Sequence, residues 1–161
     1  MRQIIRRREL VPEDVHYPGE PGGNGTRAVA PLAEFITAVN SGQPVGNAVL
    51  IEPTDEVELL ATHLSRLNLM VIDFPKVGEG RGYSQARLLR QRLRYPGELR
   101  ARGALKRDQL LFLARCGFDS FQLDASENLQ AALAGFDSFS VGYQDGSEEF
   151  IHLRRRDSGT R

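Results

Sequence analysis

The chain has 161 residues, of which 40% are hydrophobic and 26% are charged, and its formal net charge at pH 7 is zero. This length predicts one compact domain, and the balanced charge disfavours general attraction to nucleic acid. No apolar run approaches the roughly 20 residues that a membrane-spanning helix requires. Because Cys116 is the single cysteine, no intrachain disulfide can form. The basic first ten residues lack the apolar stretch of a secretory signal, so we expect a cytoplasmic protein.

The first thirty residues differ in composition from the rest of the chain. A short strand is expected around Ile4 and Ile5, and the run PGEPGGNGT at residues 18–26 favours turns and an open backbone. We therefore expect an N-terminal strand and Gly/Pro-rich loop over residues 1–30. An α/β domain over 31–146 and a C-terminal tail over 147–161 complete this division.

From Pro31 onward, helical patterns alternate with short apolar runs. The first helix carries Leu32, Phe35, Ile36 and Val39 on one face. Further helices are expected from Asp55, from Ser84, from about Lys106 and through residues 129–133, and strands at 47–53, 68–75, 97–101 and 118–123, with a possible fifth at 139–143. This order predicts parallel βαβ units, and a complete eight-unit barrel needs about 250 residues. The expected fold is therefore α/β, either an incomplete (β/α) barrel or an open sheet with flanking helices.

The loop FPKVGEGRGYS follows a strand that ends at Asp73 and contains three alternate glycines. Ligands of parallel α/β sheets bind at the carboxyl ends of the strands, where such loops gather. With Ser84 as the expected N-cap of the next helix, Arg81, Gly82 and Ser84 are candidates for binding an anion. The loop has neither a complete dinucleotide fingerprint nor a P-loop, and the alternative is a flexible connection capped by serine.

The strand around GELRA raises a question about charge. Alternation places Glu98 and Arg100 on one face of a strand expected to be interior. The two side chains must either neutralise each other or line a wet cavity near Asp73. We take Arg100 as a further anion-binding candidate and Glu98 as its support.

The next helix begins with Asp108 and Gln109 in its first turn. Asp108 and Asp73 are the candidates for a general base, although a carboxylate in a first helical turn is also an ordinary stabilising feature. Gln109 is a candidate supporting residue. The three histidines show no metal-ligand spacing, so no metal site is predicted, and no motif identifies a cofactor.

The segment from Phe74 to Gln144 resembles a bacterial family of uncharacterised domains. The sequence motifs that carry this resemblance are, in chain order, FPKVGEGRGYSQARLLR, GELRARG, KRDQL, RCGFDSF and FSVGYQ. Glu79 stands where the family usually has aspartate, which keeps the charge. Family members are generally encoded beside assimilatory sulfite reductase and are often described as oxidoreductases of sulfite reduction.

The resemblance implies an accessory protein of assimilatory sulfate or sulfite reduction. Such a protein would bind a sulfur oxyanion or assist sulfite reductase or another enzyme of sulfate reduction as a partner. Two alternatives stay open from the residues. One is a small (β/α)-type enzyme acting on an anionic metabolite, with Asp73 or Asp108 as base and Arg81 as anion clamp. The other is a protein-interaction module without catalysis.

Overall fold

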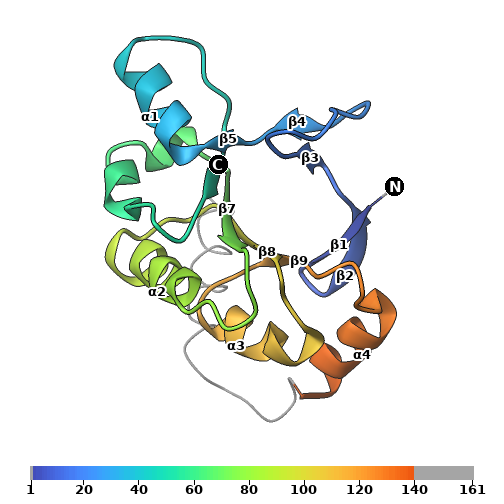
Figure 1. Ribbon diagram of the computed structural model, residues 1–161. Coiled ribbons are helices and arrows are strands. Elements are labelled where there is room, and N and C mark those ends of the chain that lie inside the picture. The colour runs from blue at the N-terminus through green and yellow to red at the C-terminus, as the bar shows by residue number, and fades with distance from the viewer. Residues whose placement is uncertain (1, 140–161) are drawn as a thin grey trace, which may run out of the picture.

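The computed structural model describes residues 2–139, and a seven-stranded sheet in the order β2-β1-β9-β8-β7-β6-β5 forms its centre (Figure 1). The strands are β1 (Gln3–Arg6), β2 (Glu9–Pro12), β5 (Ala30–Pro31), β6 (Ala48–Ile51), β7 (Leu69–Phe74), β8 (Glu98–Gly103) and β9 (Ser120–Gln122). Strands β5 to β9 are parallel to one another, whereas β1 pairs antiparallel with both β9 and β2. The predicted α/β class with parallel units is confirmed, and within residues 2–139 the sheet does not close into a barrel.

The helices lie on the outer side of the curved sheet in Figure 1. They are α1 (Leu32–Asn40), α2 (Arg81–Arg87), α3 (Leu110–Arg115) and α4 (Leu129–Phe139), with shorter helical segments η1 (Val57–Leu60), η2 (Leu64–Arg66), η3 (Leu88–Arg92) and η4 (Arg107–Gln109). No helix within residues 2–139 is long and apolar enough to cross a membrane.

Two details of the expected helices are wrong. The segment from Asp55 forms the 3₁₀ turns η1 and η2 and not an α-helix. Val57 and Leu60 are three residues apart, and this spacing also suits a 3₁₀ turn, which buries both side chains. The helix expected to start at Ser84 begins instead at Arg81 with Gly80 as its N-cap residue.

Near the C-terminus, α4 extends through Phe139, so the possible strand at 139–143 begins as helix. The remainder of that prediction lies outside the described residues.

A core on each face of the sheet holds the fold together. The outer core packs the helices against the sheet and contains large side chains such as Phe35, Phe74 and Leu89. The inner core is smaller and consists of Val15, Tyr17, Val29, Ala48, Leu50, Leu69 and Val71. Its first three members come from the short parallel pair β3 (Val15–His16) and β4 (Arg27–Ala28) and the residues beside it. The N-terminal segment therefore covers the inner face of the sheet.

Candidate functional site on the inner face of the sheet

The inner face of the sheet changes from apolar to polar between β7 and β8. Val71 on β7 is in register with Arg100 on β8, which is in register with Ser120 on β9. Since side chains alternate along a strand, Glu98 and Arg102 point to the same face as Arg100. Strand β8 thus presents three charged side chains to the interior, which is possible only if they find partners.

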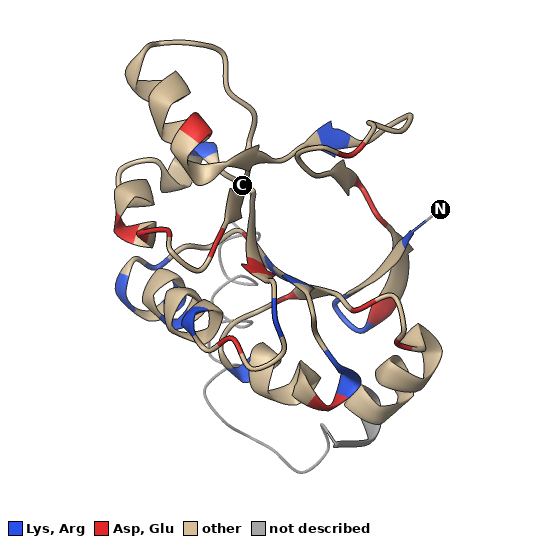
Figure 2. Cartoon of the chain, in the orientation of Figure 1, with Lys and Arg blue, Asp and Glu red and all other residues tan. Residues whose placement is uncertain are grey.

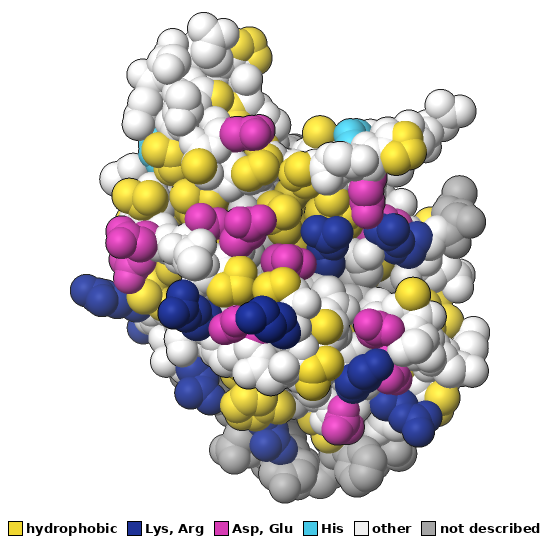
Figure 3. Space-filling model, viewed as in Figure 1, with side chains coloured by type: hydrophobic (Ala, Val, Ile, Leu, Met, Phe, Trp, Pro, Cys, Tyr) yellow, Lys and Arg dark blue, Asp and Glu magenta, His cyan; other side chains and the backbone are white. Residues whose placement is uncertain are grey.

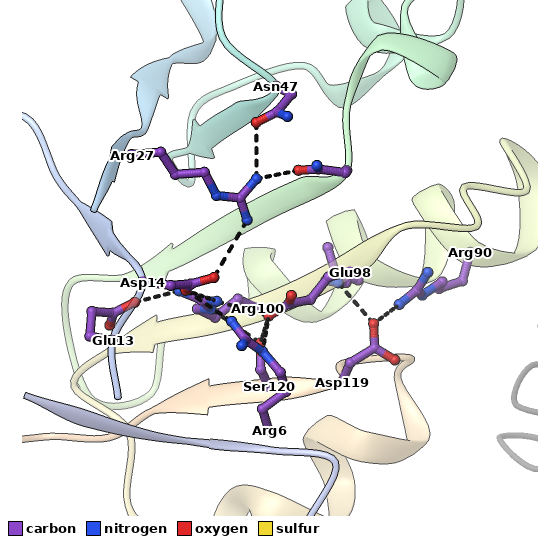
Figure 4. A network of polar contacts seen from close by, with 12 residues as sticks. Arg6, Glu13, Asp14, Arg27, Asn47, Arg90, Glu98, Arg100, Asp119 and Ser120 are labelled. Atoms are coloured by element: carbon purple, nitrogen blue, oxygen red, sulfur yellow. Dashed lines mark hydrogen bonds and ion pairs between the residues drawn. The ribbon is translucent and has the colours of Figure 1, made fainter. Parts of the chain in front are cut away.

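Arg100 is fully buried and is the centre of an ion-pair network (Figure 4). Its Nη2 atom lies 2.9 Å from Glu98 Oε1 and 3.0 Å from Asp14 Oδ1, and its Nη1 atom donates to Glu13. Its Nε–H donates to Ser120 Oγ at 3.2 Å. Of the two alternatives for Glu98 and Arg100, mutual neutralisation is the one that the structure shows.

Two more arginines complete what we call the inner network, which consists of Arg6, Glu13, Asp14, Arg27, Glu98, Arg100 and Ser120. Arg6 lies 2.9 Å from Asp14 and 3.2 Å from Glu98, and Arg27 lies 3.7 Å from Asp14. The network holds three guanidinium groups and three carboxylates, so their formal charges cancel. An added anion would have to displace a carboxylate that is already paired.

The network shifts the pKa values of its carboxyl groups in different directions. Burial opposes ionisation of Glu98, but the charge of Arg100 and hydrogen bonds from Ser120 and Arg100 outweigh it and lower the pKa of Glu98. The pKa of Asp14 is lowered in the same way, with burial opposed by Arg100 and Arg6. Burial dominates at Glu13 and raises its pKa. Glu13 Oε2 is buried without a hydrogen-bond partner among the described residues.

A second group of polar side chains lies at the carboxyl ends of the same strands. Asp73, Arg102 and Gln122 are in register across β7, β8 and β9, and we call them the edge row. Each lies two residues beyond a member of the Val71, Arg100 and Ser120 row, so all three share the inner face. This edge is where ligands of parallel sheets bind.

Arg102 is held loosely compared with Arg100. Its guanidinium lies over the ring of Tyr17, with 3.8 Å from Cζ to the ring centroid. Its nearest carboxylates are Asp73 Oδ1 at 3.9 Å and Glu20 Oε1 at 3.8 Å, both beyond hydrogen-bond distance. Within residues 2–136, whose side chains the structure describes, no acceptor takes a hydrogen bond from the Arg102 guanidinium. Stacking fixes the plane of this group and leaves the N–H edges unmatched.

The other members of the edge row are unmatched acceptors. Burial raises the pKa of Asp73, with the charge of Arg102 acting in the opposite direction. Gln122 is 9% exposed, and its Oε1 atom is buried without a donor among the described side chains. The Tyr17 hydroxyl also lacks a partner there, and burial raises the pKa of Tyr17 to about 12. The edge row thus joins an arginine that lacks an acceptor to two acceptors that lack donors.

The anion-binding candidates of the glycine-rich loop lie on α2. Arg81 is exposed, and its backbone N–H donates to Glu79 Oε1 at 3.2 Å. Gly82 packs so closely against Phe74 that a Cβ atom would overlap the phenyl ring. Ser84 is an exposed residue inside the helix and makes no cap. Arg100, by contrast, is enclosed by the inner network, so the structure does not bring the four anion-binding candidates together.

The remaining candidates lie near α3. The Gln109 side chain accepts from the Lys106 backbone N–H at 2.8 Å and donates to the Tyr83 hydroxyl at 3.0 Å. Asp108 is in the turn η4, beside a mainly apolar groove of about 440 Å³ lined by Arg107, Asp108, Leu110, Leu111, Ala131, Ala132, Gly135 and Phe136. Of the two candidate bases, only Asp73 lies in the edge row.

The distribution of charge over the molecule is mixed. Blue and red segments are both spread over the chain in Figure 2, and both signs are interspersed on the face drawn in Figure 3. On this face of the described residues, no basic patch dominates. Arg102 in the edge row is therefore a more specific candidate for anion binding than the Lys and Arg residues of segment 76–107 taken together.

Residues 48–151 match a family described as bacterial protein of unknown function (DUF934). The chain belongs to the DUF934 family. No curated protein and no solved structure matches the chain. The part that matches DUF934 begins at β6 and includes the whole edge row, together with Glu98, Arg100 and Ser120. The carboxylates Glu13 and Asp14 and the stacking ring of Tyr17 lie before it.

In this DUF934 chain, sequence reasoning missed Arg102 as a site residue. The alternation that places Glu98 and Arg100 on one face extends to Arg102, but the expected strand covered only residues 97–101. Strand β8 in fact continues through Gly103, which has φ of +121° and approaches the Phe74 carbonyl too closely for a Cβ atom. Extending the alternation by one step would have placed Arg102 on the same face as Arg100.

Proposed function

We propose that this DUF934 protein is an accessory protein of assimilatory sulfite reduction that binds a sulfur oxyanion through Arg102. The resemblance of its sequence to proteins encoded beside sulfite reductase supports the pathway. One structural observation supports the ligand, namely the stacked Arg102 guanidinium whose N–H groups have no acceptor among the described residues. A planar guanidinium with free edges suits oxyanions because it can donate two parallel hydrogen bonds.

Direct binding tests the ligand. Sulfite and sulfate are titrated into the purified protein at constant ionic strength, and the melting temperature and heat of binding are measured. Binding to the native state raises the melting temperature by mass action. We expect a saturable shift that Arg102→Met removes and that Arg87→Ala, on the exposed surface of α2, leaves unchanged. Equal shifts in all three proteins would indicate general screening and reject the site.

The glycine-rich loop is tested in the same titration. Loss of the shift in Arg81→Ala, with Arg102→Met unaffected, would move the anion site to Arg81, Gly82 and Ser84. The short helix α2 and the exposure of Arg81 give that site less support than the edge row has.

Growth tests the pathway. A bacterium that lacks this gene should grow poorly with sulfate or sulfite as sulfur source and normally with sulfide or cysteine. A tagged protein should also co-purify with sulfite reductase if it assists that enzyme directly. Normal growth of the deletion strain on sulfate would contradict the accessory role.

A small (β/α)-type enzyme is the second candidate. Asp73 favours it, because burial raises the pKa of this carboxyl group beside an arginine that can hold an anionic substrate. The enzyme would use Asp73 as general base and Arg102 as anion clamp, in place of the expected Arg81. Turnover of an anionic metabolite that Asp73→Asn abolishes, while ligand binding remains, would favour this function over the accessory role.

A further inference from the structure

The edge row has a pattern of donors and acceptors that restricts its ligand. Neighbouring parallel strands are about 4.8 Å apart, so register-matched side chains on one face are close neighbours. Asp73 and Gln122 flank Arg102 in this way. A ligand that contacts Arg102 is therefore close to the side chain of Asp73, 3.9 Å from the Arg102 guanidinium.

Each member of the edge row lacks a hydrogen-bond partner within the described part of the chain. Arg102 lacks a hydrogen-bond acceptor, and the Oε1 atom of Gln122 lacks a donor, among the described residues. The Asp73 carboxylate accepts no hydrogen bond from the described residues either, and the Arg102 guanidinium lies 3.9 Å from it. Leaving a buried polar atom unmatched costs about 1–3 kcal/mol, which a complementary ligand can recover.

Glu20 does not supply the hydrogen-bond acceptor that Arg102 lacks. Its carboxylate accepts from Arg2 at 3.3 Å and from the Tyr17 backbone N–H at 3.3 Å, and it stays 3.8 Å from Arg102. With Asp73, it places two carboxylates beside one guanidinium. An oxyanion satisfies Arg102 but offers no donor to Asp73, so a ligand that also carries a cationic donor should bind more tightly.

We infer that the edge row binds a small zwitterion of the α-amino-acid type. The ligand's carboxylate accepts from Arg102, and its ammonium group donates to the neighbouring Asp73. This inference rests on the proposed function in one respect, namely that Arg102 is the anion-binding group of the site. It goes further because it requires a cationic donor on the same ligand.

The experiment compares complete ligands with their halves. Each of the standard amino acids is titrated into the full-length protein at constant ionic strength, with propionate and ethylammonium as compounds that carry only one of the two groups. We expect at least one amino acid to bind saturably and to raise the melting temperature, while propionate binds more weakly than that amino acid and ethylammonium shows no saturable binding at the same concentration. Absence of saturable binding by all the amino acids would overturn the inference.

Variants assign the two contacts. Asp73→Asn should weaken amino-acid binding by about tenfold or more, the loss of one charged hydrogen bond, and should leave sulfite binding unchanged or stronger. Arg102→Met should remove both kinds of binding, and Arg87→Ala should remove neither. Amino-acid binding that survives Arg102→Met in a folded protein would place the ligand elsewhere and reject the inference.

The outcomes separate this inference from the proposed function. Sulfite binding that depends on Arg102, without amino-acid binding, supports the proposed oxyanion site and rejects the zwitterion. Amino-acid binding that depends on Arg102 and Asp73, without sulfite binding, supports the zwitterion and rejects the oxyanion. Absence of both rejects the edge row as a ligand site.

Discussion

Strand β8 carries two arginines, Arg100 and Arg102, whose side chains differ in their contacts and in their burial. Arg100 and Arg102 point to the same face two residues apart, yet Arg100 contacts three carboxylates and a serine, whereas Arg102 makes no hydrogen bond to the described residues. Arg100 is fully buried, and Arg102 is 23% exposed. The comparison indicates that a charged residue inside the sheet serves structure when its partners are complete and is available to a ligand when they are not.

The N-terminal segment creates this difference. Glu13 and Asp14 reach Arg100 from the chain between β2 and β3, and Tyr17 stacks on Arg102 from just beyond β3. The segment thus gives carboxylates to one arginine and an aromatic face to the other. A ring face can hold a guanidinium in place without occupying the edges that donate hydrogen bonds.

The largest expected effect is on stability when Arg100 is replaced. Arg100→Met leaves Glu13, Asp14 and Glu98 without their shared counter-ion and should destabilise the protein by about 3–5 kcal/mol. The matched change Arg102→Met removes two long ion pairs and the stacking on Tyr17 and should cost about 1–2 kcal/mol. Urea denaturation at neutral pH measures both. Equal losses would show that the two arginines do not differ in the way proposed.

The next effect concerns Glu98 and depends on pH. Glu98→Gln keeps the shape of the side chain but weakens hydrogen bonds to Arg100 and Ser120, which should cost about 1–3 kcal/mol at pH 7. Because the network lowers the pKa of Glu98 below its ordinary 4.5, its contribution is present above pH 4.5 and is lost as the pH falls through the folded-state pKa.

Denaturation of wild type and Glu98→Gln over a pH series measures this dependence. The difference in unfolding free energy should be constant above pH 4.5 and should shrink below it. Glu9→Gln on the exposed strand β2 is the matched control and should cost little at any pH. A difference that grows on acidification would contradict the lowered pKa.

Asp73 in the edge row should behave in the opposite way. Since burial raises its pKa above 3.8, this group stabilises the fold below pH 3.8, and that contribution is lost as the pH rises through the folded-state pKa. Without ligand, Asp73→Asn should therefore be slightly more stable than wild type at pH 7, by about 0.5 kcal/mol. Thermal unfolding above and below pH 3.8 measures the difference, which should disappear on the acidic side. A variant less stable than wild type at pH 7 would give Asp73 a structural role.

The sequence predicted much of the parallel part of the sheet because its signals are local. The apolar run at 68–75 became β7, and the alternation in GELRA correctly paired Glu98 with Arg100. The i, i+3, i+4 pattern from Leu32 became α1. The same local patterns could not separate a 3₁₀ turn from an α-helix at Val57–Leu60, because both place residues i and i+3 on one side.

The site was harder to predict because its partners are distant in the chain. Glu13 and Asp14 are 87 and 86 residues from Arg100, and no periodicity joins them. Strand β3 has only two residues, too few for an alternating pattern. The contacts of residues 13–17 with the inner face of the sheet therefore depend on tertiary packing. The difference between Arg100, which has a full set of partners, and Arg102, which has none at hydrogen-bond distance among the described residues, depends on the same packing.

The smallest expected effect concerns the hydroxyl of Tyr17. This oxygen is buried without a hydrogen-bond partner among the described residues, so Tyr17→Phe removes a polar group whose burial is unfavourable and should not destabilise the protein. Stability should change by less than about 0.5 kcal/mol. Ligand binding should be retained, because a phenyl ring still offers a face to Arg102.

Tyr17→Leu is the informative counterpart. It removes the aromatic face and part of the inner core, so it should destabilise the protein by about 1–3 kcal/mol and weaken ligand binding. Calorimetric titration of both variants with the best edge-row ligand measures binding, and thermal unfolding measures stability. If Tyr17→Phe lost binding while remaining as stable as wild type, the hydroxyl itself would contact the ligand. The edge row would then extend to Tyr17, and stacking on Arg102 would explain only part of its role.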